Sequence, residues 1–321
     1  MTSSSQSLDM NGITAVEIAT FNGDILTMTA VGEARLDSTI KGNATFAVEH
    51  IGSLLYIHAK KQHHRYGGAG VTFIASLPAG LHLKLATVGG AVRHHGPVQQ
   101  LEVTASNGDI TITSTGQGSV RLKGANTNIV TDDTDGLLVI TTAKGNVRVT
   151  GCQGSVTVDS SQGDIRVTNV IGAITVHTGD GEVRVQGIRG SVFLTTSNGE
   201  VRINEVVGPV SANTANGTIH LHDTQGQLEV VTKSGEIHSE RIKLDPGTTS
   251  LLKSANRTIN IHNCQAPGGL EIRAKDYQAL KHNSLPGYAI QVERRRFFAR
   301  FDGPHIAKLH IETPGEIHIS S

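Results

Sequence analysis

Basic side chains recur at a fixed interval along the middle of the chain. The members of this set, called the basic ladder below, are Arg148, Arg166, Arg184, Arg202, His220 and His238. The step from each member to the next is always twice nine positions. Guanidinium groups donate paired hydrogen bonds to carboxylate, sulfate or phosphate. A regularly spaced file of such groups predicts a binding strip for an anionic polymer.

A mostly acidic set stands two residues before each member of the basic ladder. It comprises Asn146, Asp164, Glu182, Glu200, Thr218 and Glu236. Side chains two residues apart on an extended strand point the same way, so acids and bases would lie side by side. Exposed pairs of this kind contribute only ~0–1 kcal/mol each. The alternative to a binding strip is therefore a solvated face that neutralises itself.

The elements that must position these side chains follow from a glycine repeat. Twelve glycines occur at steps of nine, at positions 136, 145, 154, 163, 172, 181, 190, 199, 208, 217, 226 and 235. The nines alternate in character, as in Gly181-Glu-Val-Arg-Val185 and Ser191-Val-Phe-Leu194, so the repeating unit is a pair of nines. Each half is a short alternating run rich in β-branched residues, which predicts a strand.

Aligned by this unit, the apolar residues form files. Two and four residues after alternate glycines stand pairs such as Val183/Val185 and Val201/Ile203, which are predicted to face inward. A further apolar file is Cys152, Val170, Ile188 and Val206. Hydroxyl side chains predicted to bond the turning backbone at a corner are Thr142, Ser160, Thr178, Thr196, Thr214 and Thr232.

Two architectures could use this repeat. In an antiparallel meander, each Asn-Gly pair would form a hairpin turn. In a solenoid, each unit is one coil, and equivalent residues stack about 4.8 Å apart. Hairpin loops tolerate insertions, whereas a coil must close on the same perimeter, and the glycine frame has no insertion between 136 and 235. We therefore expect an all-β, single-stranded parallel β-solenoid with 18-residue coils, each of two 9-residue halves, capped at the C-terminal end.

Three regions are expected along the chain. Residues 12–135 are degenerate N-terminal β-repeats, 136–240 are regular coils, and 241–321 are terminal coils and a C-terminal cap. A solenoid end exposes its core and an unpaired strand, so it needs a cap. Late aromatics, predicted to belong to the cap, are Tyr277, Tyr288, Phe297, Phe298 and Phe301, and the basic segment 294–301 is expected to be a cap strand. Residues 60–68 are expected to form an exposed loop.

The recurring Ser/Ala-Asn-Gly-Asp/Glu-Ile/Val signature has its clearest early copies in Phe21-Asn-Gly-Asp-Ile25 and Ser106-Asn-Gly-Asp-Ile-Thr-Ile112. With the Gly-terminated strands, it resembles a bacterial β-strand-repeat family of unknown function labelled "putative adhesin". The resemblance covers residues 12–262 and is strongest over 101–240. It implies a β-solenoid-like fold and a location outside the cytoplasmic membrane for many members. It brings no catalytic or binding residues.

Composition and motifs narrow the classes of function. Lys plus Arg and Asp plus Glu are 28 each, so the zero net charge removes the bulk electrostatic case for nucleic acid. The chain has no nucleotide-binding, metalloprotease or serine-hydrolase motif, and its acidic cluster Asp132-Asp-Thr-Asp135 is expected to be a loop. His220, His222 and His238 share a face without a convergent carboxylate or thiolate. We therefore expect no enzyme activity, no catalytic residues, no metal site and no cofactor.

The preferred hypothesis is a non-enzymatic, adhesin-like scaffold that binds through flat exposed β faces. Its partner is expected to be an anionic polysaccharide or a protein, with no nucleic acid and no membrane span, and homo-oligomers are compatible with it. The alternatives are a carbohydrate-active enzyme on a β-helix and a self-assembling structural protein. Residues 1–10 show no basic-then-apolar leader, which predicts a cytoplasmic protein; a leader missing from the sequence would instead predict the cell surface.

Overall fold

The fold is that of a computed structural model of the 321-residue chain, which describes residues 1–61, 68–275, 278–282, 289–293, 296–301, 303 and 305–320. The chain forms two compact units, Met1–Gln162 and Gly163–Ser321, and each is described by itself. This division falls inside the region 136–240. Every regular element among the described residues is a β-strand. The all-β prediction is confirmed. Tyr277, Tyr288, Arg294 and most of the 60–68 loop lie outside the described residues.

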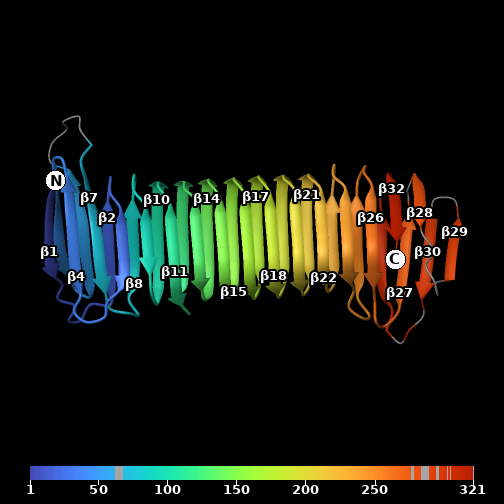
Figure 1. Cartoon of the computed structure of the whole chain (residues 1–321), viewed down its shortest axis with the longest axis horizontal. Helices are drawn as coiled ribbons and strands as arrows, with labels where there is room; N and C mark the ends of the chain where they lie inside the picture. The colour runs from blue at the N-terminus through green and yellow to red at the C-terminus, as the bar shows by residue number, and fades with distance from the viewer. Residues whose placement is uncertain are drawn as a thin grey trace. The chain divides into compact units, whose positions relative to one another are not determined.

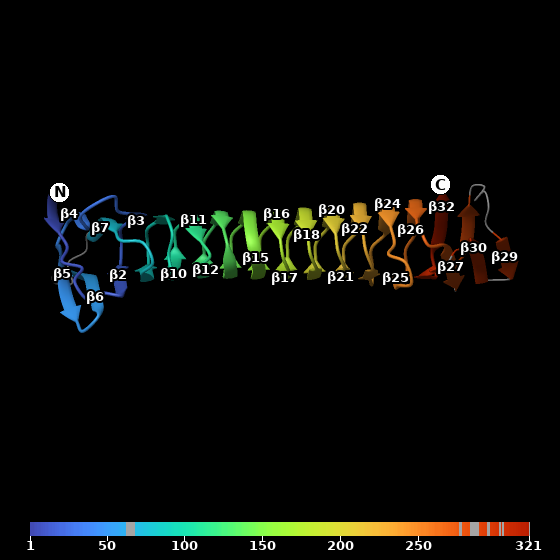
Figure 2. The same ribbon diagram turned by 90° about the horizontal axis from the view of Figure 1, so that it is seen from below.

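Each regular coil of the second unit contributes one strand to each of two sheets, which form two layers (Figures 1 and 2). In spatial order, sheet A contains β16 (Ile165–Ile171), β18 (Val183–Arg189), β20 (Val201–Val207), β22 (Ile219–Gln225), β24 (Ile237–Lys243), β26 (Ile259–Gln265), β32 (Glu316–Ser320) and β28 (Ala279–His282). Sheet B contains β17 (Ile174–Asp180), β19 (Val192–Asn198), β21 (Val210–Asn216), β23 (Leu228–Thr232), β25 (Thr249–Ser254), β31 (Ala307–Glu312), β27 (Leu270–Lys275), β30 (Arg296–Phe301) and β29 (Ala289–Glu293).

The register confirms the solenoid and its ~18-residue coil. Arg184 of β18 stands beside Arg202 of β20, and Leu194 of β19 stands beside Ala212 of β21, in parallel pairings. Neighbouring strands of the regular coils therefore run in the same direction, as a meander would not allow. The step is longer between Ile237 and Ile259, where the Asp-Pro-Gly segment 245–247 adds a loop.

The predicted apolar files form the core. Val183, Val185 and Ile188 are at most 1% exposed, and Val201, Ile203 and Val206 repeat the pattern one coil on. Burial of aliphatic side chains is worth ~25 cal/mol per Å² of apolar surface, so identical files along the axis make every coil stabilise its neighbours. With only 3% aromatic residues, the chain builds this core from Val, Ile and Leu.

Glycine recurs at every ninth position because consecutive coils approach each other most closely at their corners. A Cβ atom on Gly199 would lie 1.9 Å from the carbonyl oxygen of Gly181, and one on Gly190 would lie 2.1 Å from that of Gly172. Gly190 also has a φ of +147°, which L-residues rarely adopt. The two glycine positions of each coil thus leave no room for a side chain.

The hydroxyl file lies at a corner and is buried, as predicted. Thr142, Ser160 and Thr178 each donate a hydrogen bond to the carbonyl oxygen two residues further on, at 3.2–3.3 Å. Thr232 donates to Gly217 O at 3.0 Å. Thr196 and Thr214 are also buried, but their Oγ1 atoms have no hydrogen-bond partner among the described residues. The bonding part of the prediction is therefore confirmed at four of the six positions.

A file of left-handed residues bends the sheet A strands, and the glycine frame does not reveal it. Its members recur once in every coil and are Ser114 (φ 55°), Asp133 (53°), Gly151 (62°), Asn169 (55°), Gly187 (68°), Glu205 (54°), Asp223 (49°), Arg241 (52°) and Asn263 (53°). Glycine adopts this conformation at no steric cost, whereas other L-residues are strained there by ~1–2 kcal/mol. Glu205, Asp223 and Arg241 therefore carry local backbone strain.

We expect Glu205→Gly to raise the stability of the protein by ~0.5–1 kcal/mol, because relief of left-handed strain exceeds the added entropy of the unfolded chain. Urea denaturation followed by circular dichroism measures the change. The control is Glu229→Gly, since Glu229 is also exposed but lies in β23 without a positive φ. Glycine at position 229 should lower the free energy of unfolding by ~0.5–1 kcal/mol. A loss of stability in both variants would contradict the strain argument.

The C-terminal cap is confirmed, with a strand order that departs from the chain order. β31 and β32 pair with β25 and β26, so they lie between that coil and the strands β27 and β28. Sheet B then continues with two antiparallel strands, β30 and β29, beyond β27. Figure 1 shows β27 to β30 beyond β26 in the second unit.

The first unit has the same two-sheet construction. In spatial order, its sheet A contains β1 (Thr2–Ser7), β4 (Arg35–Lys41), β7 (Gly70–Leu77), β3 (Ile25–Thr29), β9 (Val92–His95), β11 (Ile110–Gly116), β13 (Ile129–Thr134) and the first part of β15 (Val147–Gln162). Its sheet B contains β5 (Ala44–Ile51), β6 (Leu54–Lys61), β2 (Ala15–Thr20), β8 (His82–Thr87), β10 (Gln100–Asn107), β12 (Ser119–Asn126), β14 (Gly136–Lys144) and the second part of β15.

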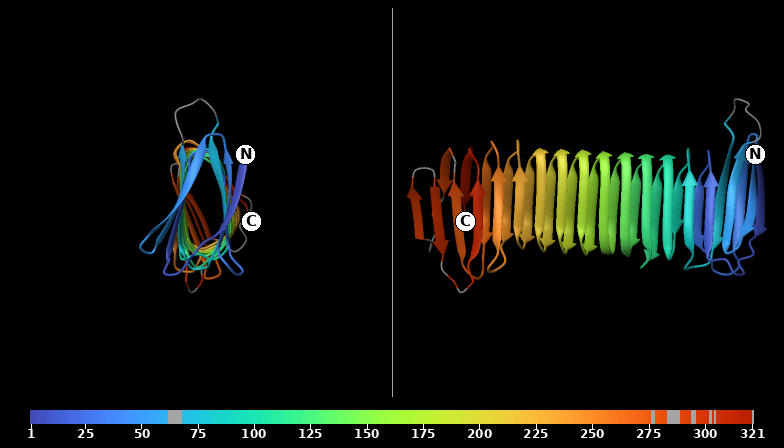
Figure 3. Two further views of the ribbon diagram at one scale, coloured as in Figure 1. Left: turned by 90° about the vertical axis from the view of Figure 1, so that its left-hand side faces the viewer. Right: turned by 180° about the vertical axis from the view of Figure 1, so that it is seen from behind.

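Two features of the first unit depart from the plain repeat. β1, β4 and β5 pair antiparallel with their neighbours, so this end also carries non-solenoid strands, which the repeat pattern does not predict. They lie among the blue strands of Figure 3. The coil from Ile110 to Ile129 is longer than a regular coil by a single residue, which falls in a bulge between Thr113 and Gly116. This bulge explains why the motif around Gly108 is out of phase with the later glycines.

Candidate functional site

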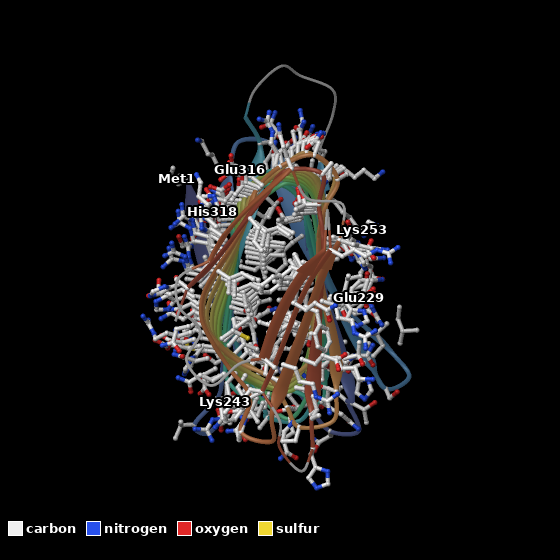
Figure 4. The ribbon with its side chains drawn as sticks, turned by 90° about the vertical axis from the view of Figure 1, so that its right-hand side faces the viewer. Met1, Glu229, Lys243, Lys253, Glu316 and His318 are labelled. Carbon is white, nitrogen blue, oxygen red and sulfur yellow. The ribbon has the colours of Figure 1, made fainter. Side chains whose placement is uncertain are left out.

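The second unit places five members of the basic ladder in one file on the outer face of sheet A. Arg166, Arg184, Arg202, His220 and His238 are register partners in sequence, and the file continues with Asn260 and His318. Figure 4 shows His318 with Glu316 on one outer side, and Glu229 with Lys253 of sheet B on another. Arg148 lies exposed on β15 of the first unit.

A groove of about 830 Å³ runs over this face of sheet A. Two files of outward side chains line it, one in the ladder position and one two residues further along each strand. They are Arg184, Arg202, His220, His238 and Asn260, followed by Gln186, Asn204, His222, Glu240 and His262. Arg166 is not among the lining residues and lies one strand beyond. Four of the six predicted ladder residues are therefore brought together in the groove.

The second file was not predicted as part of a site, although His222 was noted as sharing a face with His220. Its residue types differ from coil to coil, so no single type marks it as the repeated arginine marks the ladder. Only the position of these residues along the strands predicts that they belong to the same face. Residues two apart along a strand share a face, so the residue two after each ladder member must also point outward.

Two glutamates of the acidic set, Glu182 and Glu200, each bridge two neighbouring ladder members. Glu182 accepts from Arg184 Nε at 2.5 Å and from Arg202 Nε at 2.9 Å. Glu200 lies 2.8 Å from both Arg202 Nη2 and His220 Nε2. The hydrogen bond from Arg184, together with the charges of Arg184 and Arg202, lowers the pKa of Glu182. The four ladder members that line the groove are therefore already paired within the protein, as the self-neutralising alternative predicts for them.

His220 and His238 form a stacked pair in the groove. Their ring centroids are 5.0 Å apart with an interplanar angle of 10°. His238 Nε2 lies 2.9 Å from Glu236 Oε2, and Asn260 Nδ2 lies 3.1 Å from His238 Nδ1. Because the Asn260 amide nitrogen can only donate, His238 Nδ1 is the acceptor of this hydrogen bond. Burial lowers the pKa of His220, and the charge of Arg202 acts in the same direction, whereas Glu200 opposes the shift.

A second ionic cluster borders the groove around His222. Arg241 donates to Asp223 from Nε and Nη2 at 2.6 and 2.9 Å, and its Nη1 lies 2.6 Å from Glu240 Oε1. Arg241 also contacts the His222 ring. His222 Nδ1 lies 2.9 Å from Asn204 Oδ1. Asp223 and Arg241 are two of the strained left-handed residues, so the bend in the strands helps to aim this cluster at the rim.

The charges of the ion pairs that border the groove nearly cancel when the imidazoles are neutral. Three guanidinium groups, those of Arg184, Arg202 and Arg241, meet five carboxylates, those of Glu182, Glu200, Asp223, Glu236 and Glu240. The net charge is then two negative units. Four histidines line the groove, so their full protonation would reverse the net charge to two positive units. The face is therefore rich in hydrogen-bonding groups without being basic at neutral pH.

The other chemistry considered in the sequence falls elsewhere. Asp132 and Asp133 lie exposed in strand β13, so the expectation that this acidic cluster forms a loop is wrong for these two residues. Asp133 occupies the left-handed bend. Across the described part of the chain, no three His, Cys, Asp or Glu side chains are placed to hold a metal ion. No helix among the described residues has the length and apolarity needed to cross a membrane.

The model of one protein family matches the chain. It is described as Toastrack DUF4097 and matches residues 82–186 and 170–250, which include the regular coils and the groove strands up to β24. The family is one of unknown function. No curated protein matches the sequence.

Two crystal structures are similar over most of the chain. A "putative cell adhesion protein" from Clostridium sporogenes has 10% identity and a TM-score of 0.23, with 99% of this chain and 98% of that chain covered. A "Putative lipid binding protein" from Parabacteroides distasonis has 12% identity and a TM-score of 0.28, with 82% and 95% covered.

Proposed function

Since the chain belongs to the Toastrack DUF4097 family, a family with no assigned activity, we propose that it is a non-enzymatic binding scaffold whose sheet A groove holds an extended anionic polysaccharide. The observation that carries this proposal is the groove of about 830 Å³ lined by two registered files of hydrogen-bonding side chains. The label of adhesion on one similar structure is compatible with such a role and adds no detail to it.

The spacing of the files supports a polymeric ligand. Equivalent side chains on neighbouring strands repeat about every 4.8 Å, so an extended polymer lying across the strands meets the same kind of position at regular intervals. Gln186, Asn204 and Asn260 present amides that can donate to and accept from sugar hydroxyls. Each coil would then contact successive sugar units in an equivalent way.

The arginines support a ligand that carries carboxylates. Arg184 and Arg202 are 45% and 51% exposed, and their partners are the glutamates of their own face. A ligand carboxylate can replace a glutamate oxygen on a guanidinium fork without leaving either charge buried, because the site is open to water. Binding by such exchange is weak per contact, so affinity would come from several contacts along the polymer.

Removing the two groove arginines should weaken binding to polygalacturonate. We expect R184A/R202A to raise the Kd in biolayer interferometry by about tenfold, which corresponds to ~1.4 kcal/mol. The matched control is R189A/K233A, which removes the same charge from exposed positions outside the groove lining. The control should bind as the unchanged protein does.

Other outcomes of this experiment would overturn the proposal. An equal loss in both double variants would mean diffuse attraction and no groove. Binding to polyglutamate but not to polygalacturonate would identify an acidic protein as the partner. New reducing ends in the incubated polymer would show that the protein is an enzyme.

A further inference from the structure

We propose that protonation of the four histidines in the groove switches its affinity for polyanions, so that binding is strong near pH ~5.5 and weak near pH ~7.5. This inference rests on the proposed function, because it concerns the same groove and the same class of ligand. The four residues are His220, His222, His238 and His262. They come from three consecutive strands, β22, β24 and β26.

The net charge of the groove depends on its imidazoles. With neutral imidazoles, the carboxylates of the face outnumber its guanidinium groups by two, so a polyanion meets net repulsion. Histidine is the side chain whose ordinary pKa of about 6.5 allows it to change charge between pH ~5 and ~8. Acidification therefore adds positive charge to this face.

Charged and amide groups surround the stacked pair His220 and His238. His220 faces Glu200 and Arg202 on β20 and His238 on β24. His238 faces Glu236 on its own strand and Asn260 on β26. Each ring already uses Nε2 toward a glutamate, so a second proton goes to Nδ1. At His238 that proton forces the Asn260 amide to turn its oxygen inward, which rearranges a lining residue of the groove.

The other two rings, those of His222 and His262, also lie beside charged or polar groups. His222 faces Asn204 on β20 and Asp223 on its own strand, and it also meets Glu240 and Arg241 on β24. His262 is exposed, stands beside Glu240 in the register, and its Nδ1 lies 2.6 Å from Ser320 Oγ on β32.

The stacked pair explains why the ligand and the protons would bind together. Two imidazolium rings 5.0 Å apart repel each other, and burial further disfavours the charge on His220. A carboxylate of the ligand lying along the file compensates both effects. By linkage, a ligand that favours the protonated face must take up protons as it binds.

The test measures polygalacturonate binding by calorimetry at pH 5.5 and pH 7.5. The ligand keeps its charge over this range, since its carboxylates titrate well below it. We expect the unchanged protein to bind at least about tenfold more tightly at the lower pH. The variant H220Q/H238Q keeps hydrogen-bonding side chains but cannot be protonated, and should retain no more than about a threefold difference. Proton uptake, obtained at pH 6.5 from two buffers of different ionisation enthalpy, should fall in the variant.

The control and the contrary outcomes separate this inference from the proposed function. H177Q removes an exposed histidine from the sheet B strand β17 and should keep the full pH dependence. Equal affinity at both pH values, or an unchanged pH dependence in H220Q/H238Q, would overturn the switch and leave the binding function standing. No binding at either pH would overturn both. All three residues are on the surface, and circular dichroism would verify that the variants remain folded.

Discussion

Gly199→Ala is expected to destabilise the protein by ~3 kcal/mol or more. The added methyl group would collide with backbone atoms, which cannot move aside as a side chain can. Its Cβ would lie 1.9 Å from the carbonyl oxygen of Gly181, an atom of the neighbouring coil's backbone. The φ of Gly199 lies outside the left-handed region, so the effect isolates steric contact from backbone strain.

The damage should extend to the hydrogen bonds beside the contact. Asn198 O accepts from Gly181 N at 3.2 Å, and Glu200 O accepts from Val183 N at 2.9 Å, so these bonds hold the two coils together on either side of Gly199. Pushing the corner apart weakens both, at ~1 kcal/mol each.

Urea denaturation followed by circular dichroism measures this loss as a lower midpoint. The control is Gly68→Ala, because nothing lies within 4 Å of a Cβ placed there and Gly68 has no positive φ. It should change stability by less than ~0.5 kcal/mol. If the two variants had equal midpoints, the close stacking of corners would be contradicted.

Val176→Asp is expected to cost ~3–5 kcal/mol, because it places an unpaired carboxylate inside the coil. Val176 is 0% exposed and stands beside Leu194 in the register of sheet B. The aliphatic files offer no cation to such a group. Burial would raise the pKa of the new carboxyl. The loss should therefore be larger at pH ~8, where the unfolded state is ionised, than at pH ~4, where both states hold more of the proton.

His177→Asp is the matched control for this change, since His177 is the next residue along β17 and points outward. It should alter stability by no more than ~0.5 kcal/mol. The two variants together test the alternation of the strand at a single step. Similar losses from both would mean that the side-chain direction is wrong.

Much of the fold could be predicted because stacking imposes the same demand on every coil. Gly181, Gly199 and Gly217 recur for one steric reason, so their period reports the perimeter directly. The left-handed file could not be predicted from glycine, since Glu205, Asp223 and Arg241 occupy positions where Gly187 shows the ordinary solution. The direction of the strands could not be predicted either. Residues 35–41 show the alternation of buried and exposed side chains that any strand shows, yet β4 pairs antiparallel with both neighbours.

The candidate site was predictable where residue type repeats and hidden where only position repeats. The repeated arginines, such as Arg184 and Arg202, predict the ladder. The glutamates two residues before them predict its ion pairs. Gln186, Asn204 and His262 share nothing but their place in the register, so they emerged only with the groove. The stacking of His220 on His238 could not be predicted either, because the spacing of the repeat places the two residues side by side but does not determine how their rings are oriented.

The insertion of β31 and β32 beneath β27 and β28 has a consequence for how the chain is made. Residues 270–282 leave the ribosome before residues 307–320, yet their parallel neighbours are formed by those later residues. Winding can therefore follow synthesis only as far as β26. Beyond it, β27 and β28 cannot take their parallel places in the two sheets until residues 307–320 have been made, although β27 can already pair with β30.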